Sequence, residues 1–408
     1  MKLLLLTDIP PCKNYTAGLV LDQLCRFLPP GSISCFCVAV RELNASLSPD
    51  LKWIPIHYEY RPRETLTTFS KRFTSLHTLL NLGLYMYNKP VMKSIASKAI
   101  KFGRAFGADT LWCTLEGPTQ LRLALDVAAG LDVPLLTEVL DPPTWILRDQ
   151  STPSLLQAIL LRRFDMILRK SSSCATASWP MAKQYAKQYG AKTVALLPSL
   201  DARMALTPAS GLNSGDELVI GMAGQIYATE EWEALIRALD SVDWRICGRH
   251  VRIRLLGRWV SLKFNNPVRI EYLGWHNQDN CVALLSEADI LYLPYLFDRA
   301  FETEARLSFP SKLTTYFAAG RPVLFHGPEY AAPWEFLKLN EAAYGCHSNE
   351  HSHIIDAFTT LTTDTNLYSK LTRNGNAAFQ NYLTLSLLRK SFAAFLQIEE
   401  NSLVPTEQ

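Results

Sequence analysis

Two positions in this chain carry residue types suited to binding phosphate and hydroxyl groups. Lys312 follows a Pro-Ser turn shortly after the apolar run 289–294. A lysine where a helix begins suits an anion, because the free backbone N–H groups there also carry positive charge. Asp141 follows the apolar run 133–139, where a carboxylate can accept a hydroxyl proton or hydrogen-bond a sugar. The spacing predicts an anion site in the second half and a hydroxyl-binding site in the first.

The elements that position these residues follow from the alternation of apolar runs and amphipathic stretches. Strands are expected at 2–7, 32–40, 53–57, 110–113, 133–139, 174–177 and 193–197, with helices between them. Residues 198–216 hold two Pro, two Gly and three Ser, and the alternation resumes at 217. Strands separated by helices predict right-handed βαβ units and a parallel sheet in each half. Ligands bind at the carboxyl ends of such strands, so polar residues just past each strand are the candidates.

Composition excludes several classes of protein. At 408 residues the chain is too long for one compact domain, and a hydrophobic content of 48% is ample for two cores. A net charge of +3 and the lack of a recognised module argue against nucleic-acid binding. The nine Cys and eight His show no metal-ligand spacing, so we expect reduced thiols, no metal site and a cytoplasmic location. The apolar start ends at Thr7 and is interpreted as a buried strand, not as a signal peptide.

The segment 61–104 differs from the rest of the chain in charge. It holds nine Lys or Arg against the single Glu64, interleaved with leucines and aromatic residues at helical spacing. Two interpretations stay open. The segment lies on an anionic membrane surface, which would make the protein peripheral on the inner face of a membrane, or it is a solvated basic face over a core stripe.

The segment 299–324 resembles the nucleotide-sugar loop of GT-B glycosyltransferases, in particular family 4, where a Pro-x-Lys-Leu-x-Glu-Tyr-x-Ala-x-Gly-x-Pro-Val pattern recurs. The matching residues are Pro310, Lys312, Leu313, Tyr316, Ala318, Gly320, Pro322 and Val323, and Thr315 stands in place of the glutamate. The resemblance implies an α/β protein of the GT-B class. In that class two doubly wound Rossmann-like domains face each other across a cleft, and the C-terminal helix crosses back to the first domain.

The resemblance also implies a division of the chain and an activity. The expected acceptor domain covers 1–199 with about 384–408, a linker covers 200–216, and the nucleotide-sugar domain covers 217–383. The expected reaction transfers a sugar from a nucleoside-diphosphate sugar to a hydroxyl of a glycan, a lipid-linked acceptor or a small molecule. It retains anomeric configuration and needs no metal or cofactor; the donor is a UDP-sugar, with a GDP-sugar as the alternative.

The candidate residues follow from strand ends and from this resemblance. The expected donor-binding residues are Gly18, Gly224, Gln225, Arg258, Trp275, His276, Arg299, Glu302, Glu304, Pro310, Ser311, Lys312 and Thr315. Lys312 would stabilise the leaving diphosphate, Thr315 would meet the ribose, and Glu302 and Glu304 are expected in a loop. The expected acceptor residues are Thr16, Glu138 and Asp141, with Lys312 and Asp141 in catalytic roles.

Alternative interpretations accompany several of these residues. Asp141 precedes Pro-Pro and could cap a helix, and Gly18 could serve only close packing. Glu138 has apolar neighbours that would raise its pKa if it is buried. Gln225 and Glu230 stand where family 4 members carry Arg and Lys, and neither adds positive charge. Two other classes therefore stay open, a GT-B nucleotide-sugar epimerase and a non-catalytic relative that binds a glycan or a partner enzyme.

Overall fold

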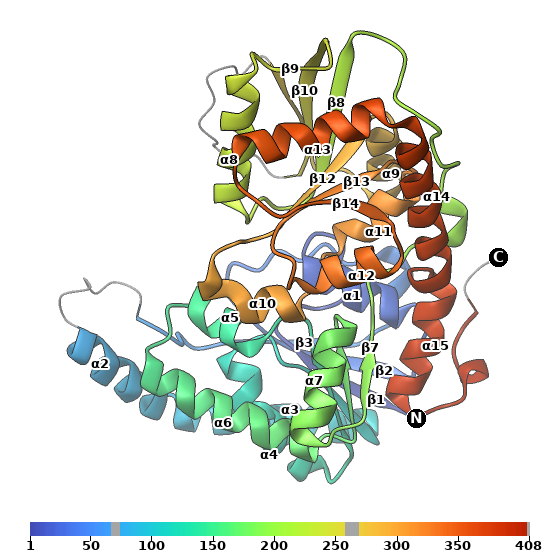
Figure 1. Cartoon of the computed structure of the whole chain (residues 1–408). Helices are drawn as coiled ribbons and strands as arrows, with labels where there is room; N and C mark the ends of the chain where they lie inside the picture. Colours follow the sequence, from blue (N-terminus) through green and yellow to red (C-terminus); the bar gives the residue numbers. More distant parts are fainter. Residues whose placement is uncertain (67–73, 258–268, 406–408) are drawn as a thin grey trace. The chain divides into compact units, whose positions relative to one another are not determined.

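The computed structural model describes residues 1–66, 74–257 and 269–405. The chain forms two compact units (Figure 1). Unit 1 comprises Met1–Leu196 and Arg389–Gln408, and unit 2 comprises Leu197–Leu388. Arg258, one of the expected donor residues, lies outside the described residues.

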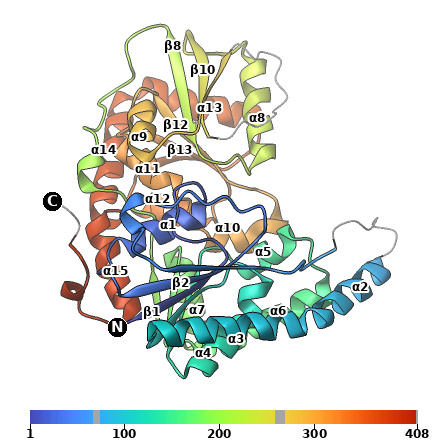
Figure 2. The same ribbon diagram turned by 180° about the vertical axis from the view of Figure 1, so that it is seen from behind.

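Unit 1 is built on a parallel sheet in the order β3-β2-β1-β4-β5-β6-β7 (Figures 1 and 2). Its strands are β1 (Leu3–Thr7), β2 (Ile33–Ala39), β3 (Ile56–Tyr60), β4 (Thr110–Thr114), β5 (Leu135–Val139), β6 (Ser173–Thr176) and β7 (Thr193–Ala195). Its first helices are α1 (Thr16–Cys25), α2 (Thr74–Tyr87), α3 (Lys89–Phe106), α4 (Pro118–Leu131), α5 (Pro143–Asp149), α6 (Ser154–Lys170) and α7 (Trp179–Tyr189). Every residue of β1 and β2 is buried, as expected for parallel strands with both faces covered. The strand order reverses between β1 and β4, which makes that point the topological switch.

Unit 2 repeats this architecture in the order β11-β10-β8-β12-β13-β14, with β9 antiparallel to β10. Its strands are β8 (Glu217–Ala223), β9 (Arg245–Ile246), β10 (Arg249–Leu256), β11 (Ile270–Gly274), β12 (Ile290–Pro294), β13 (Val323–His326) and β14 (Ala343–Cys346). The helices that follow β7 in the chain are α8 (Thr229–Ser241), α9 (Gln278–Ser286), α10 (Glu302–Leu307), α11 (Lys312–Ala318), α12 (Ala332–Leu339), α13 (His351–Thr363), α14 (Thr365–Tyr382) and α15 (Leu385–Leu396). The switch point of this sheet lies between β8 and β12.

Two expected elements differ from the structure. The helical spacing expected in the segment 61–104 belongs to two helices, because α2 ends at Tyr87 and Pro90 opens α3, where its missing N–H does no harm. Residues 67–73 of that segment lie outside the described residues. Residues 299–307, expected as a loop, form a 3-10 turn over Arg299–Phe301 followed by α10. Alternating charge and small residues hid the helical spacing there.

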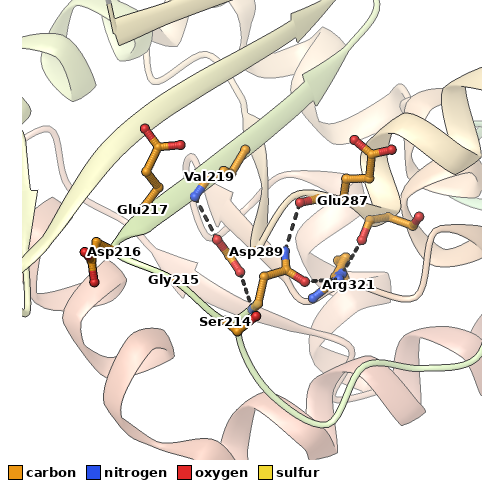
Figure 3. A pocket seen from close by; sticks show the side chains of 10 residues that line it. Ser214, Gly215, Asp216, Glu217, Val219, Glu287, Asp289 and Arg321 are labelled. Carbon is orange, nitrogen blue, oxygen red and sulfur yellow. Dashed lines mark hydrogen bonds between the residues drawn. The ribbon is translucent and has the colours of Figure 1, made fainter.

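Residues of the expected linker 200–216 belong to unit 2, and side chains hold them at the amino-terminal edge of its sheet. The Asp289 carboxylate accepts the backbone N–H groups of Asn213 and Val219, at 2.7 and 2.8 Å. Arg321 donates to the Ser286 carbonyl and to the Asn213 side chain. Figure 3 shows these groups around an open pocket of about 480 Å³. The polar groups around this pocket bind one another, so their role is structural. The pocket lies at the amino-terminal edge of the sheet, whereas ligands of such sheets bind at the carboxyl-terminal edge.

The last helix of the chain completes the core of unit 1. The Phe392 ring of α15 is fully buried, with its centroid 5.5 Å from that of Trp112 and 6.3 Å from that of Phe27. After α15 the chain stays on this unit, because the Val404 N–H donates to the Phe27 carbonyl at 2.8 Å. The chain thus returns to the first unit, as the resemblance implies.

Phe392→Ala is expected to lower the free energy of unfolding by about 3–5 kcal/mol, the range for removing a buried Phe side chain. The measurement is urea unfolding followed by circular dichroism. Leu339→Ala, at an exposed position of α12, is the matched control and should change little. An unchanged stability in Phe392→Ala would contradict the role given to α15.

Candidate functional site

The switch point of unit 2 is held together by one tyrosine of α11. The β8–β12 ladder pairs only Ile220 with Ile290 and Gly221 with Leu291. Beyond this, the buried Tyr316 hydroxyl accepts the Ala223 N–H at 3.2 Å and donates to the Tyr292 carbonyl at 3.0 Å. A single side chain therefore spans the point where the two strands part, and it fixes α11 against both strand ends.

Lys312 lies on the same face of α11 as Tyr316, because residues four apart are neighbours on a helix. Its Nζ atom donates to the Gln225 carbonyl at 3.0 Å and lies 5.1 Å from the centroid of the Tyr227 ring. The side chain is only partly exposed, and burial lowers the pKa of Lys312 to about 7. An ammonium that has lost part of its hydration gains more from an arriving anion than a fully solvated one.

Three glycines end neighbouring strands of unit 2, and one of them, Gly224, adjoins this lysine. Gly224, Gly257 and Gly274 follow or end β8, β10 and β11 with φ of 90°, 145° and 76°, a region that favours glycine. The Gly224 N–H donates to the Leu256 carbonyl, and the Gly257 N–H donates to the Gly274 carbonyl. A Cβ atom added at Gly257 would lie 2.7 Å from the Gly224 oxygen, and one added at Gly224 would lie 3.8 Å from Lys312 Nζ. Bare backbone at Gly224 therefore adjoins the lysine, and no side chain there hinders the close approach of a ligand.

The remaining expected donor residues of unit 2 fall into two groups. Near the glycines, Trp275 is exposed, and His276 Nε2 lies 2.9 Å from the Leu273 carbonyl. Thr315 is partly exposed, one turn after Lys312. Pro310 is buried, and Ser311 precedes α11 without a side-chain cap. These residues surround one strand edge, whereas the second group lies on the 3-10 turn and α10.

The second group consists of Arg299, Glu302 and Glu304. The first two take part in ion pairs, and Glu304 is buried. The Glu302 carboxylate lies 2.8 Å from the guanidinium of Arg306, and the well exposed Arg299 approaches it at 3.9 Å. The Glu304 side chain is nearly buried. Their places on a short helix, rather than in a loop, leave Glu302 as the more accessible carboxylate of the pair.

Unit 1 gathers carboxylates at the carboxyl ends of its strands. Asp8 and Glu116 follow β1 and β4, the two strands that flank the switch point, and Asp141 follows β5. Glu116 Oε1 accepts the Leu140 N–H at 3.3 Å. Burial, together with the charges of Asp8 and Asp141, raises the pKa of Glu116 well above its usual value. Asp8 and Glu116 were not among the sequence candidates. Asp8 directly follows the expected strand 2–7 and Glu116 lies three residues after the expected strand 110–113, so a systematic search of strand ends would have found them.

The structure decides the alternatives for the other candidates of unit 1. Helix α5 begins at Pro143 with Pro142 as its N-cap, so Asp141 does not cap it and remains exposed. Glu138 lies within β5 and is buried. Trp112 Nε1 donates to its carboxylate at 3.0 Å, and burial raises the pKa of Glu138 to about 7. Gly18 accepts the Cys12 N–H, and a Cβ atom there would collide with Cys12, so close packing explains this glycine. Thr16 is exposed at the start of α1.

Comparison with known proteins identifies the fold. No family model matches the chain, and no curated protein matches its sequence. Anabaena HepE in complex with UDP is 14% identical, with a TM-score of 0.64 over 97% of this chain and 100% of that one. Sucrose-phosphate synthase from Thermosynechococcus elongatus is 11% identical, with a TM-score of 0.66 over 97% and 98%. Trehalose 6-phosphate synthase from Burkholderia multivorans is 13% identical, with a TM-score of 0.62 over 97% and 98%. The neighbours are GT-B glycosyltransferases, and this chain has the GT-B fold.

Tyr316→Phe should destabilise the protein by about 1–3 kcal/mol, because it leaves buried backbone groups of β8 and β12 without their partner. Chemical denaturation measures the change. Tyr330→Phe is the matched control, since the Tyr330 hydroxyl has no hydrogen-bond partner among the described residues. Equal stabilities of the two variants would show that the bridge between the strands is dispensable.

Proposed function

We propose that the protein is a glycosyltransferase that moves a sugar from a nucleoside-diphosphate sugar to a hydroxyl group. The observation that carries the proposal is the position of Lys312 at the switch point of unit 2, beside the backbone of Gly224. A diphosphate at this place would replace the Gln225 carbonyl as the partner of the ammonium. Ligands of doubly wound sheets bind at such switch points.

A UDP-sugar is the proposed donor. HepE has been solved with UDP and with UDP-glucose, and it shares the fold over nearly the whole chain. In our proposal the ribose meets Thr315, and the base lies near Trp275, His276 and Gly274. Glu302 reaches the sugar hydroxyls. A GDP-sugar is the alternative donor.

The proposed chemistry retains anomeric configuration and needs no metal. The bond from the anomeric carbon to the diphosphate oxygen breaks, and a bond to the acceptor oxygen forms on the same face of the sugar. The acceptor proton passes to the departing diphosphate. Lys312 stabilises the negative charge that develops on that leaving group, which is the electrostatic part of catalysis.

Asp141 is proposed to orient the acceptor rather than to remove its proton. It is the exposed carboxylate at the edge of the unit 1 sheet, and Asp8 and Glu116 follow neighbouring strands of that sheet. Carboxylates are suited to accept hydrogen bonds from sugar hydroxyls. The acceptor is therefore a hydroxyl of a glycan, of a lipid-linked sugar or of a small molecule.

A non-catalytic binding protein is the second candidate, and the loop after β8 favours it. Gln225 and Glu230 are both exposed there, and neither brings positive charge to a diphosphate. Binding of a nucleotide sugar without any transfer or hydrolysis of the sugar would support this candidate over the enzyme.

A thermal-shift panel of UDP, GDP, ADP and dTDP tests the donor site. UDP should raise the melting temperature, since binding at about 100 times the dissociation constant stabilises the folded form by about 2.7 kcal/mol. Lys312→Gln should abolish the shift. Lys338→Gln, at an exposed position of α12, is the matched control and should keep it. If none of the four nucleotides shifts the wild type, the proposed donor site is wrong.

The lowered pKa of Lys312 predicts that binding of UDP-glucose depends on pH. The charged ammonium is the form that binds, so affinity should be constant below pH about 7 and fall by up to roughly tenfold per pH unit above it. Calorimetric titration with UDP-glucose from acidic to mildly alkaline pH is suitable, because its diphosphate keeps its charge over this range. Lys312→Arg keeps a permanent charge and should remove the dependence while preserving binding. A pH-independent affinity in the wild type would contradict contact between Lys312 and the diphosphate.

A further inference from the structure

Helix α2 exposes a continuous apolar stripe. Its members are Leu76 (45% exposed), Leu79 (67%), Leu80 (36%), Met86 (60%) and Tyr87 (78%), and we call them the α2 stripe. Their spacing, with the exposed Gly83 between them, places all of them on one side of the helix. An amphipathic helix usually turns such a face toward the core, and here it is turned to the surface.

The opposite side of α2 anchors it to unit 1. Asn81 is fully buried, its Oδ1 atom accepts the Leu66 N–H at 2.9 Å, and its Nδ2 atom donates to the His77 carbonyl. The helix packs on α3 and α6, and Figures 1 and 2 both show it at the margin of the unit. The orientation of the stripe is therefore fixed by a buried polar contact and by packing.

The helices that carry and follow the stripe are basic. Together α2 and α3 contain five Lys or Arg and no Asp or Glu. Lys89 and Lys93 are exposed on the first turns of α3, directly after the stripe. Lys98, farther along α3, is paired with Glu59 at 2.8 Å and is not counted with them. Apolar residues beside unneutralised cations complement a surface that is anionic outside and apolar beneath.

We propose that the α2 stripe docks on an anionic lipid bilayer. The five side chains enter the boundary between headgroups and acyl chains, and Lys89 and Lys93 contact lipid phosphates. Pairing of two stripes from two copies is disfavoured, because it would bring two basic segments together. No helix in the described part of the chain is long and apolar enough to cross a membrane, so the proposed contact is interfacial.

The docking proposal deepens the proposed function. If the protein is a glycosyltransferase, a unit 1 held on a bilayer receives its acceptor there, and the acceptor hydroxyl belongs to a lipid-linked molecule. The inference about the acceptor rests on the proposed function, whereas the docking on the bilayer does not.

Co-sedimentation with phosphatidylcholine vesicles, with and without phosphatidylglycerol, tests the docking. The wild type should bind the anionic vesicles, and added salt should weaken binding. Leu79→Ser with Met86→Ser should abolish it, and Lys89→Glu with Lys93→Glu should weaken it by roughly tenfold or more. Leu339→Ser, which changes an 81% exposed leucine of α12, is the matched control and should bind like the wild type.

Three results would overturn the proposal. They are no binding by the wild type, binding that salt and lipid charge do not affect, and unchanged binding by the Leu79/Met86 variant. Sedimentation equilibrium gives a further check, since a wild-type dimer that this variant converts to a monomer would identify a second copy as the occupant. The UDP thermal shift should be the same in all these variants, so failure of docking and failure of the donor site give different results.

Discussion

The hydroxyl of Tyr316 is the contact on which the candidate donor site depends. A parallel sheet needs a switch point to accept helices on both sides, and there the ladder between β8 and β12 ends after two pairs. Tyr316 completes the hydrogen bonds beyond that point and thereby fixes the direction of α11. Lys312, one turn earlier, is held above the end of β8 for the same reason. The separation of the β8 and β12 ends and the position of the cation beside them thus depend on the same side chain.

The electrostatics of the two units are opposite. In unit 2 a partly buried ammonium has a lowered pKa, and the backbone of Gly224 adjoins it. In unit 1 carboxylates follow the strands on each side of the switch point, and burial raises the pKa of Glu116 and Asp8. In the proposed transfer, the edge of unit 2 would bind the anionic diphosphate, and the edge of unit 1 would bind the acceptor hydroxyl.

Much of the fold could be predicted from the alternation of apolar runs and amphipathic stretches, because parallel strands covered on both faces must be apolar throughout. The lysine motif likewise located the candidate site. Helix α10 was missed, because six residues give too little periodicity to distinguish a helix from a charged loop. Glu138 was expected among the acceptor residues, with burial as the alternative, and it is enclosed beside Trp112. The expected strand and β5 end at the same residue, so local pattern placed Glu138 correctly along the chain but did not define what covers its side chain.

The sequence by itself determined two α/β halves, the position of Lys312 at the start of a helix, and the excess of basic residues in 61–104, because each depends on local composition and spacing. Only the tertiary structure decided which groups meet. The contact of Lys312 with the Gln225 carbonyl joins residues 87 positions apart. The carboxylates after β1, β4 and β5 share an edge through the strand order, and α2 turns its apolar side outward because Asn81 occupies its inner side. These depend on long-range packing, which no local pattern specifies.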